Sequence, residues 1–377
     1  MTSIGGAEMV DWNLAVATAT RLVRPGPEVS RDEARAVVAE LRRHAKSSEE
    51  HVRSFTRMGT EDTHDTPVLV VDRAGWVRAN VAGFREILKP LLDKMQDRRT
   101  GPGGTVLGAV GGKVTGVELG MLLSFLASRV LGQYETFAPA TRDLPAGANG
   151  GGRLLLVAPN IVHVERELDV DPHDFRLWVC LHEETHRTQF TAVPWLRDHL
   201  EAEIQSFLGE TEVDPMTVLE RVREAAQSLS GGRTEADGAE GAEAEESRSL
   251  VELVQTPAQR EILARLTAVM SLLEGHADFV MDGVGPDVVP SVGEIREKFQ
   301  QRRARGASRL DQALRKLLGL DAKLRQYRDG ERFVRAVVDE VGMDGFNRVW
   351  TSPNTLPTKA EIAKPADWVA RVHRKGD

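Results

Sequence analysis

The chain has 377 residues, 41% of them hydrophobic and 28% charged, which is the composition of a globular protein with a sizeable core. Its net charge of −8 is unevenly distributed, because residues 234–247 contain six acidic side chains and no basic one. The rest of the chain is nearly neutral, so its charge favours neither nucleic acid nor an anionic membrane as a partner.

Two features of the sequence indicate a cytoplasmic protein. The first ten residues lack a basic stretch followed by an apolar one, so they do not form a secretory signal. Cys180 is the only cysteine, which excludes an intrachain disulfide and fits a reducing compartment. Its apolar neighbours predict a position in the core.

The N-terminal part is expected to be mainly helical. Apolar spacing predicts a helix over 7–23, and a Ser-x-x-Glu capping box at 30–33 begins a second helix that continues beyond Leu41. The apolar run 66–72 is either a strand or an extended connector, and another helix is predicted over roughly 81–95.

Residues 106–131 form a long apolar segment that resembles a membrane span. Glu118 and Arg129 interrupt it, and such charges make membrane insertion costly. Gly116 and Gly120 lie four residues apart, a spacing that lets one helix approach another closely. We therefore expect a core helix and no membrane segment.

A strand and then a buried helix are predicted next. Residues 153–158 contain four successive large apolar side chains, Leu154 to Val157, and end at Pro159-Asn160, which is typical of a strand. Asp171-Pro172 is typical of a helix start, with an N-cap followed by proline at the first helical position. Apolar side chains then surround the whole helix up to Phe190, which indicates that it is buried.

This helix carries the His-Glu-x-x-His motif as His182, Glu183 and His186. Two histidines four residues apart lie on one helical face, so both imidazoles can reach one Zn²⁺. The glutamate between them stays free of the metal and can take a proton from water. The alternative is two core histidines with satisfied hydrogen bonds beside a surface glutamate.

The third metal ligand is expected on a second apolar helix, predicted over 257–281. Glu274 and Asp278 lie four residues apart on one face, so Glu274 can bind the metal while Asp278 orients a histidine. His276 is the alternative ligand, and it lies roughly 200° around the helix from Glu274, so both can hardly serve one ion. Gly275 would allow another backbone to approach closely.

The remaining segments connect and follow these two helices. Helices are predicted over 194–208 and 215–229, and residues 230–249 are expected to be disordered because they contain no large apolar side chain. A capping box at 291–294 begins a helix with several arginines, and 309–341 is mostly helical. Acidic residues are interleaved with the basic ones in this part of the chain, which favours a solvated face over a nucleic-acid site. A short helix is expected near Trp368.

These phrases resemble a known family. The two metal-site helices are similar to those of gluzincins, and the wider phrases resemble the actinobacterial zincin-like hydrolases, a family labelled as associated with deazaflavin coenzyme biosynthesis. The residues themselves offer no chemical support for that label. The resemblance spans most of the chain and is carried by residues 130–134, 158–160, 178–190, 193–196, 274–278 and 346–350.

The resemblance implies a zincin-type metallopeptidase fold and leaves the substrate open. Zincins commonly bind extended substrate along an edge strand before the metal helix, and the strand over 153–158 occupies the matching place, although it could equally be a core strand. Tyr134, Tyr327 and His276 are candidates for the residue that stabilises the oxyanion.

We therefore predict an α+β, predominantly α-helical fold with a zincin-like core and a small β-sheet. One integrated domain is expected from residues 1–229 and 250–377, separated by the acidic insert 230–249. The predicted function is a zinc-dependent hydrolase, most simply a metallopeptidase, with Glu183 as general base. The alternatives are a non-catalytic zincin fold that binds a partner, or a hydrolase of a non-peptide amide.

Overall fold

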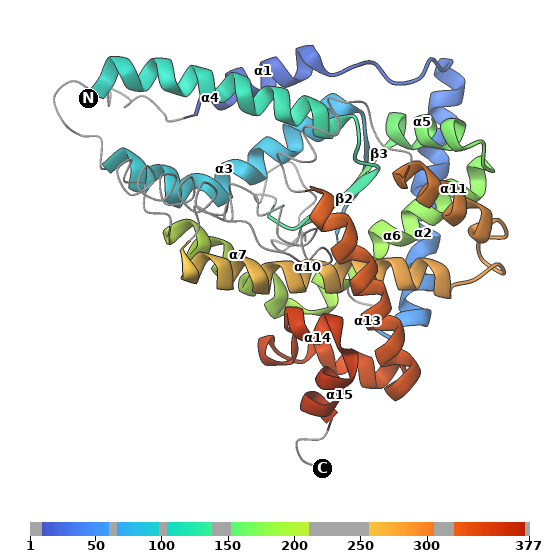
Figure 1. Cartoon of the computed structure of the whole chain (residues 1–377). Helices are drawn as coiled ribbons and strands as arrows, with labels where there is room; N and C mark the ends of the chain where they lie inside the picture. Colours follow the sequence, from blue (N-terminus) through green and yellow to red (C-terminus); the bar gives the residue numbers. More distant parts are fainter. Residues whose placement is uncertain are drawn as a thin grey trace, which may run out of the picture.

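The fold is a set of helices arranged around one small sheet (Figure 1). The computed structural model describes residues 10–59, 66–97, 104–137, 152–210, 256–304 and 320–373. The helix predicted over 215–229 and the acidic insert 230–249 lie outside the described residues. The elements are α1 (Trp12–Leu22), α2 (Arg31–Thr56), β1 (Val68–Val71), α3 (Arg73–Asp97), α4 (Gly104–Ala127), β2 (Gly132–Glu135), β3 (Arg153–Val157), α5 (Ala158–Leu168), α6 (Pro172–Ala192), α7 (Pro194–Gly209), α10 (Pro257–Gly283), α11 (Val292–Ala304), α13 (Leu320–Phe346), η1 (Asn347–Trp350), η2 (Pro353–Thr355), α14 (Lys359–Ala363) and α15 (Pro365–His373).

Local signals account for the starts of the main helices. The side chain of Ser30 accepts a hydrogen bond from the backbone of Glu33 at the start of α2, and Asp171 caps α6 in the same way. At α10, Thr256 and Gln259 form a reciprocal capping box. The predicted helical composition and small sheet are confirmed.

The sheet has the strand order β1-β3-β2, with β1 parallel and β2 antiparallel to β3. The strand predicted over 153–158 is therefore the central strand, so of the two alternatives the core strand is confirmed and the substrate-binding edge strand is not. Its residues Leu154 to Val157 are fully buried, with Leu156 in the core cluster on one face of the sheet and Leu155 and Val157 in the cluster on the other. Along β2, Gly132 and Tyr134 share one face, whereas Gln133 faces α3 and bonds to Trp76 and Asn80.

Pro159 and Asn160 lie in the first turn of α5, directly after the predicted strand. Proline is compatible with the first turn of α5, where its missing N–H is not needed. The Asn160 amide donates to the carbonyls of Ala127 and Val130 at 2.8 and 2.6 Å, and its oxygen accepts from Arg73 at 2.6 Å. These bonds attach the loop that leads into β2 to the rest of the fold.

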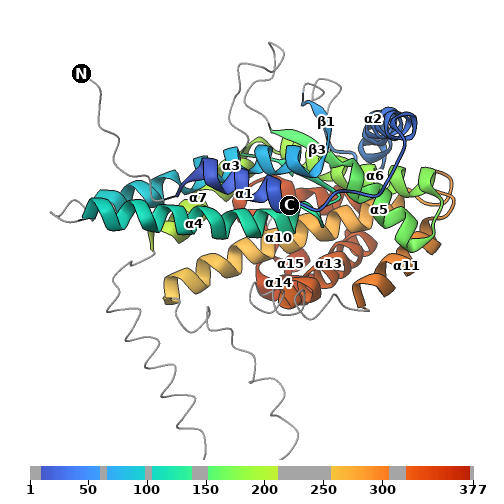
Figure 2. The same ribbon diagram turned by 90° about the horizontal axis from the view of Figure 1, so that it is seen from above.

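The glycine spacing in α4 serves helix packing, as predicted. An added Cβ at Gly116 would lie 2.7 Å from the carbonyl oxygen of Asp11, and one at Gly120 would lie 2.6 Å from Cβ of Thr18. Helices α1 and α4 consequently run side by side (Figure 2). The prediction of a core helix is only half right, because Val117 and Met121 are exposed on the other face. Among the described residues, no helix has the length and apolarity to cross a membrane.

Helix α6 lies at the centre of the molecule, in contact with α2, α10, β2 and β3. Cys180 is fully buried there, as predicted, and burial raises its pKa well above the usual range. Helix α10 crosses α13 at two glycines, because a Cβ at Gly275 would lie 2.1 Å from the carbonyl carbon of Gly330. The close backbone approach expected at Gly275 is thus confirmed.

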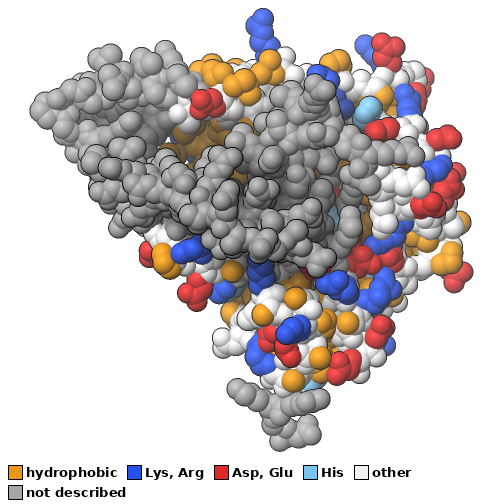
Figure 3. Space-filling model, viewed as in Figure 1, with side chains coloured by type: hydrophobic (Ala, Val, Ile, Leu, Met, Phe, Trp, Pro, Cys, Tyr) orange, Lys and Arg blue, Asp and Glu red, His pale blue; other side chains and the backbone are white. Residues whose placement is uncertain are grey.

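The visible surface carries charges of both signs. Basic and acidic side chains are interspersed over the lower part of the view in Figure 3, and hydrophobic ones gather at the upper edge over α4. On α11, Arg302 pairs with Glu167 at 2.9 Å and Arg296 with Glu331 at 2.8 Å. Each of these two arginines is thus paired with an acidic side chain.

Candidate metal centre

Helices α6 and α10 bring three potential metal ligands together. The ligand atoms of His182, His186 and Glu274 all lie within 4.8 Å of one another. The two Nε2 atoms are 3.2 Å apart, and they lie 3.7 and 3.8 Å from the carboxylate oxygens of Glu274. Ligands at 2.0–2.2 Å from a tetrahedral ion are separated by roughly 3.3–3.6 Å, so this spacing fits zinc.

Gln189 determines how the ring of His186 is protonated. The side-chain nitrogen of Gln189 lies 2.9 Å from the carbonyl oxygen of Leu273. A carbonyl oxygen can only accept, so the amide nitrogen of Gln189 donates this hydrogen bond. The amide oxygen therefore faces Nδ1 of His186, at 3.0 Å, and Nδ1 must carry the proton. The lone pair of His186 is then on Nε2, the atom that faces His182.

The same reasoning applies to His182. Its Nδ1 lies 2.9 Å from the sulfur of Met281, and a thioether is a hydrogen-bond acceptor only. With the proton on Nδ1, the lone pair of His182 is also on Nε2. The two lone pairs face each other at 3.2 Å, an arrangement that a shared positive charge, either a proton or a metal ion, would stabilise.

Glu183 lies beside these donors in a tightly limited space. An added Cβ at Gly132 would lie 2.5 Å from Cγ and Cδ of Glu183, so only glycine at this edge strand leaves room for the carboxylate. Burial, with a further contribution from Glu274, raises the pKa of Glu183 well above its usual range. A nearby cation would lower this pKa again.

The alternative ligand, His276, lies elsewhere. It is fully buried, its Nδ1 accepts from Gln189 at 3.1 Å, and its ring lies beside Phe346 and Trp350. Burial, followed by the charge of His186, lowers its pKa to about 3, so the ring is neutral. It does not belong to the donor group formed by the described residues around His182.

Asp278 is half-buried, one turn after Glu274 on α10. The described hydrogen bonds give Nδ1 of His186 to Gln189 and Nδ1 of His182 to Met281, so the role of Asp278 in orienting a histidine stays a prediction.

Of the three candidates for stabilising an oxyanion, the structure describes the side chains of Tyr134 and His276. Tyr134 stacks on Phe190 with ring centroids 5.6 Å apart, and burial raises the pKa of its hydroxyl to about 12. It thus remains a proton donor at neutral pH. The side chain of Tyr327 lies outside the described residues, and His276 is directed toward Gln189.

Two residues of this centre were not predicted as functional. Gln189 follows His186 by three residues and so lies on the same helical face, a local signal that could have identified it. Gly132 lies 51 residues before Glu183, and only the tertiary structure brings the two together.

Comparisons with known proteins agree with this geometry. Residues 10–369 match the family described as zincin-like metallopeptidase. The chain is also similar to a crystal structure from Chloroflexus aurantiacus described as "a putative hydrolase with a novel fold". The identity is 30%, the TM-score is 0.67, and the match covers 97% of this chain and all of the other. No curated protein matches. The deazaflavin association remains an implication of the sequence resemblance alone.

Proposed function

Because the chain belongs to the zincin-like metallopeptidase family, we propose that it is a zinc-dependent hydrolase, specifically a peptidase, with His182, His186 and Glu274 as metal ligands. The observation that carries the proposal is the pair of Nε2 lone pairs facing each other next to the Glu274 carboxylate. Two histidines and a glutamate leave one coordination position open in catalytic zinc sites. When bound, Zn²⁺ would supply the Lewis acidity that polarises a carbonyl and acidifies water.

The protein's own groups would handle the proton and the geometry. Glu183 accepts a proton from the attacking water at its carboxylate and returns it to the leaving amine. Gly132 leaves the space that this carboxylate occupies. Gln189 keeps the proton of His186 on Nδ1, and the sulfur of Met281 does the same for His182.

The position of β2 supports a peptide substrate. Within the described part of the chain, β2 pairs only with β3, so its other edge has backbone N–H and C=O groups available. An extended peptide can add to such an edge as a further strand. Since Gly132 of this strand lies against Glu183, a peptide bound there would pass close to the proposed base.

Two substitutions separate the roles of base and ligand. We expect Glu183→Gln to keep the zinc content but to reduce peptide hydrolysis by at least a factor of roughly 10². Glu274→Ala should instead lose zinc, because one of three anchors is removed. Zinc is measured by elemental analysis, and hydrolysis with a broad peptide library with and without chelator.

Three results would each contradict a different part of the proposal. Undiminished cleavage by Glu183→Gln would refute the mechanism. Loss of zinc from His276→Ala with retention by Glu274→Ala would refute the ligand assignment. A zinc-loaded chain that cleaves small non-peptide amides and no peptide would refute the substrate class while leaving the site intact.

A further inference from the structure

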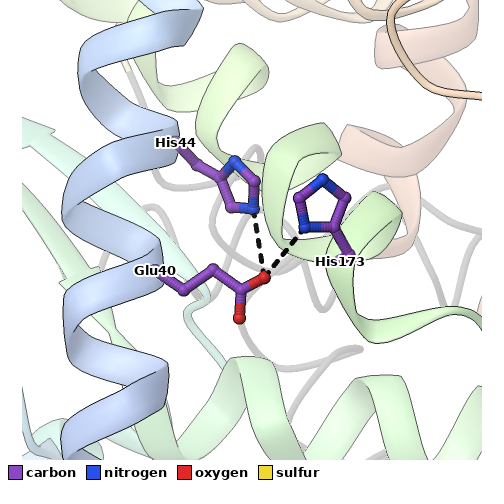
Figure 4. A group of neighbouring side chains, drawn as sticks. All are labelled: Glu40, His44 and His173. Atoms are coloured by element: carbon purple, nitrogen blue, oxygen red, sulfur yellow. Dashed lines mark hydrogen bonds and ion pairs between the residues drawn. The ribbon is translucent and has the colours of Figure 1, made fainter.

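A second group of metal-ligating side chains lies where α2 meets the beginning of α6 (Figure 4). Glu40 and His44 are one turn apart on α2, and His173 is the second residue of α6. One oxygen of Glu40 lies 2.9 Å from Nδ1 of His173 and 3.5 Å from Nε2 of His44. The three ligand atoms lie within 4.8 Å of one another.

His44 has a buried nitrogen with unmet hydrogen-bonding capacity. The residue is only 6% exposed, and its Nε2 makes no hydrogen bond among the described residues, because the Glu40 oxygen 3.5 Å away meets it only as a long ion pair. A buried polar atom left unpaired costs roughly 1–3 kcal/mol, so such atoms usually have a partner or a ligand. This nitrogen is directed at the same Glu40 oxygen that contacts His173 (Figure 4).

The carboxylate between the two histidines is held in place from its other side. Arg176 pairs with the second oxygen of Glu40 and also with Glu165. The first oxygen is thereby left facing both imidazoles, whose rings are perpendicular neighbours with centroids 4.6 Å apart. Separations of 2.9 and 3.5 Å are close to the roughly 3.3–3.6 Å between ligands of a tetrahedral ion.

We propose that Glu40, His44 and His173 bind a second divalent transition-metal ion, of the zinc class, that joins α2 to the N-terminal end of α6. Imidazole nitrogens and a carboxylate oxygen are donors suited to zinc, copper or nickel and poorly suited to calcium. His173 and His182 are nine residues apart on α6, about 14 Å along the helix axis, so the two centres are separate.

The surroundings set the expected strength of this site. Arg176 and the positive end of α6 repel a cation, whereas Glu40 and Glu165 attract it. The second site should therefore bind zinc more weakly than the donor group of His182, His186 and Glu274. Because its ligands belong to two helices, the bound ion should stabilise their contact.

The test uses the full chain carrying His182→Ala and His186→Ala, so that the first centre cannot bind. Calorimetric titration with Zn²⁺ and the visible absorption of added Co²⁺ report the remaining site. We expect one ion per chain in this background. Adding His173→Ala should weaken zinc binding by at least roughly 10- to 100-fold, which is the effect of losing a residue that only orients a metal ligand.

A matched control is available on α5. His163 is exposed and lies 3.9 Å from Glu167 one turn later, but it belongs to no three-donor group of the described chain. His163→Ala should leave the titration unchanged. Glu40→Gln keeps the side chain's size but removes its charge and should abolish binding, and circular dichroism checks that each variant is folded.

The two metal proposals fail in distinguishable ways. If the His182→Ala/His186→Ala chain binds no zinc at millimolar concentration, or if His173→Ala and His163→Ala titrate alike, the second site is refuted and the first remains. If the unmodified chain binds a single ion whose loss follows His173→Ala and not His182→Ala, the second site stands and the proposed catalytic centre is refuted.

Discussion

At the scale of single residues, one amide controls the chemistry of the metal centre. Gln189 is fully buried, and its two ends are distinguished by a backbone carbonyl that can only accept. Because the nitrogen of Gln189 donates to that carbonyl, its oxygen accepts from His186, which fixes the proton of His186 on Nδ1 and the lone pair on Nε2. Loss of an orienting partner of this kind typically lowers metal affinity roughly 10- to 100-fold.

The role of Gln189 can be tested by a substitution that keeps its volume. We expect Gln189→Met to weaken zinc binding roughly 10- to 100-fold, because His186 loses the acceptor that holds its ring. Thr191→Ala is the control, since among the described residues the Thr191 hydroxyl bonds only to the carbonyls of Arg187 and Thr188 in its own helix. Equal zinc affinities for both variants would show that Gln189 does not position the histidine.

At the scale of elements, β2 and α6 meet at a contact that tolerates no side chain. Gly132 lies on the edge strand with its Cα against the Glu183 carboxylate, and the preceding loop is held by Asn160. The strand therefore positions the proposed base as well as offering an edge for substrate.

Gly132→Ala should separate activity from metal binding. The added methyl group would force Glu183 to move, so we expect hydrolysis to fall by at least a factor of roughly 10 while zinc content stays unchanged. Gly83→Ala is the control, because its new Cβ would lie no closer than 3.5 Å to any neighbour outside its own helix. Full activity of Gly132→Ala would argue against Glu183 as the base.

Helices α10 and α13 depend on a second close approach. A Cβ at Gly330 would lie 1.9 Å from the carbonyl oxygen of Ser271, and one at Gly275 would also meet backbone. We expect Gly275→Ala to reduce the free energy of unfolding by about 3 kcal/mol, the upper end of overpacking costs, because the backbone cannot turn aside as a side chain can.

Helix α11 provides a matched control for that substitution. Gly293 has open space around its missing Cβ, so Gly293→Ala should be neutral or stabilising by up to about 1 kcal/mol. Both variants are measured by denaturant unfolding. Similar stabilities would show that α10 and α13 can separate without cost.

At the scale of the whole molecule, a metal ion in the candidate centre would join two helices that are distant in the sequence. His186 and Glu274 are 88 residues apart in the sequence, and their helices α6 and α10 meet only in the folded chain. An ion that binds only the folded chain stabilises it by about 2.7 kcal/mol when its free concentration is 100 times the Kd.

Removing the metal should therefore lower the melting temperature. We expect a chelator to reduce the Tm by several degrees, and Zn²⁺ but not Mg²⁺ to restore it, since Mg²⁺ prefers oxygen ligands. The shift should be smaller in a His182→Ala/His186→Ala chain. An unmodified protein, purified with zinc, whose Tm does not respond to chelator would contradict a metal-stabilised fold.

Much of this protein was determined locally by its sequence. The starts of α2, α6 and α10 follow from capping residues and prolines, and the four-residue spacings place His182 with His186 and predict Glu274 and Asp278 on one face. These features depend on contacts within a few residues, which periodicity describes well. The acidic insert 230–249 stays a prediction.

Other features were decided only by the tertiary structure. Strand β2 was not predicted, because four residues with mixed polarity carry little signal and their pairing with β3 supplies the strand. The contact of Gly132 with Glu183 and the meeting of His44 with His173 join residues far apart in the chain. No local pattern encodes such contacts, since they exist only once helices and strands have packed.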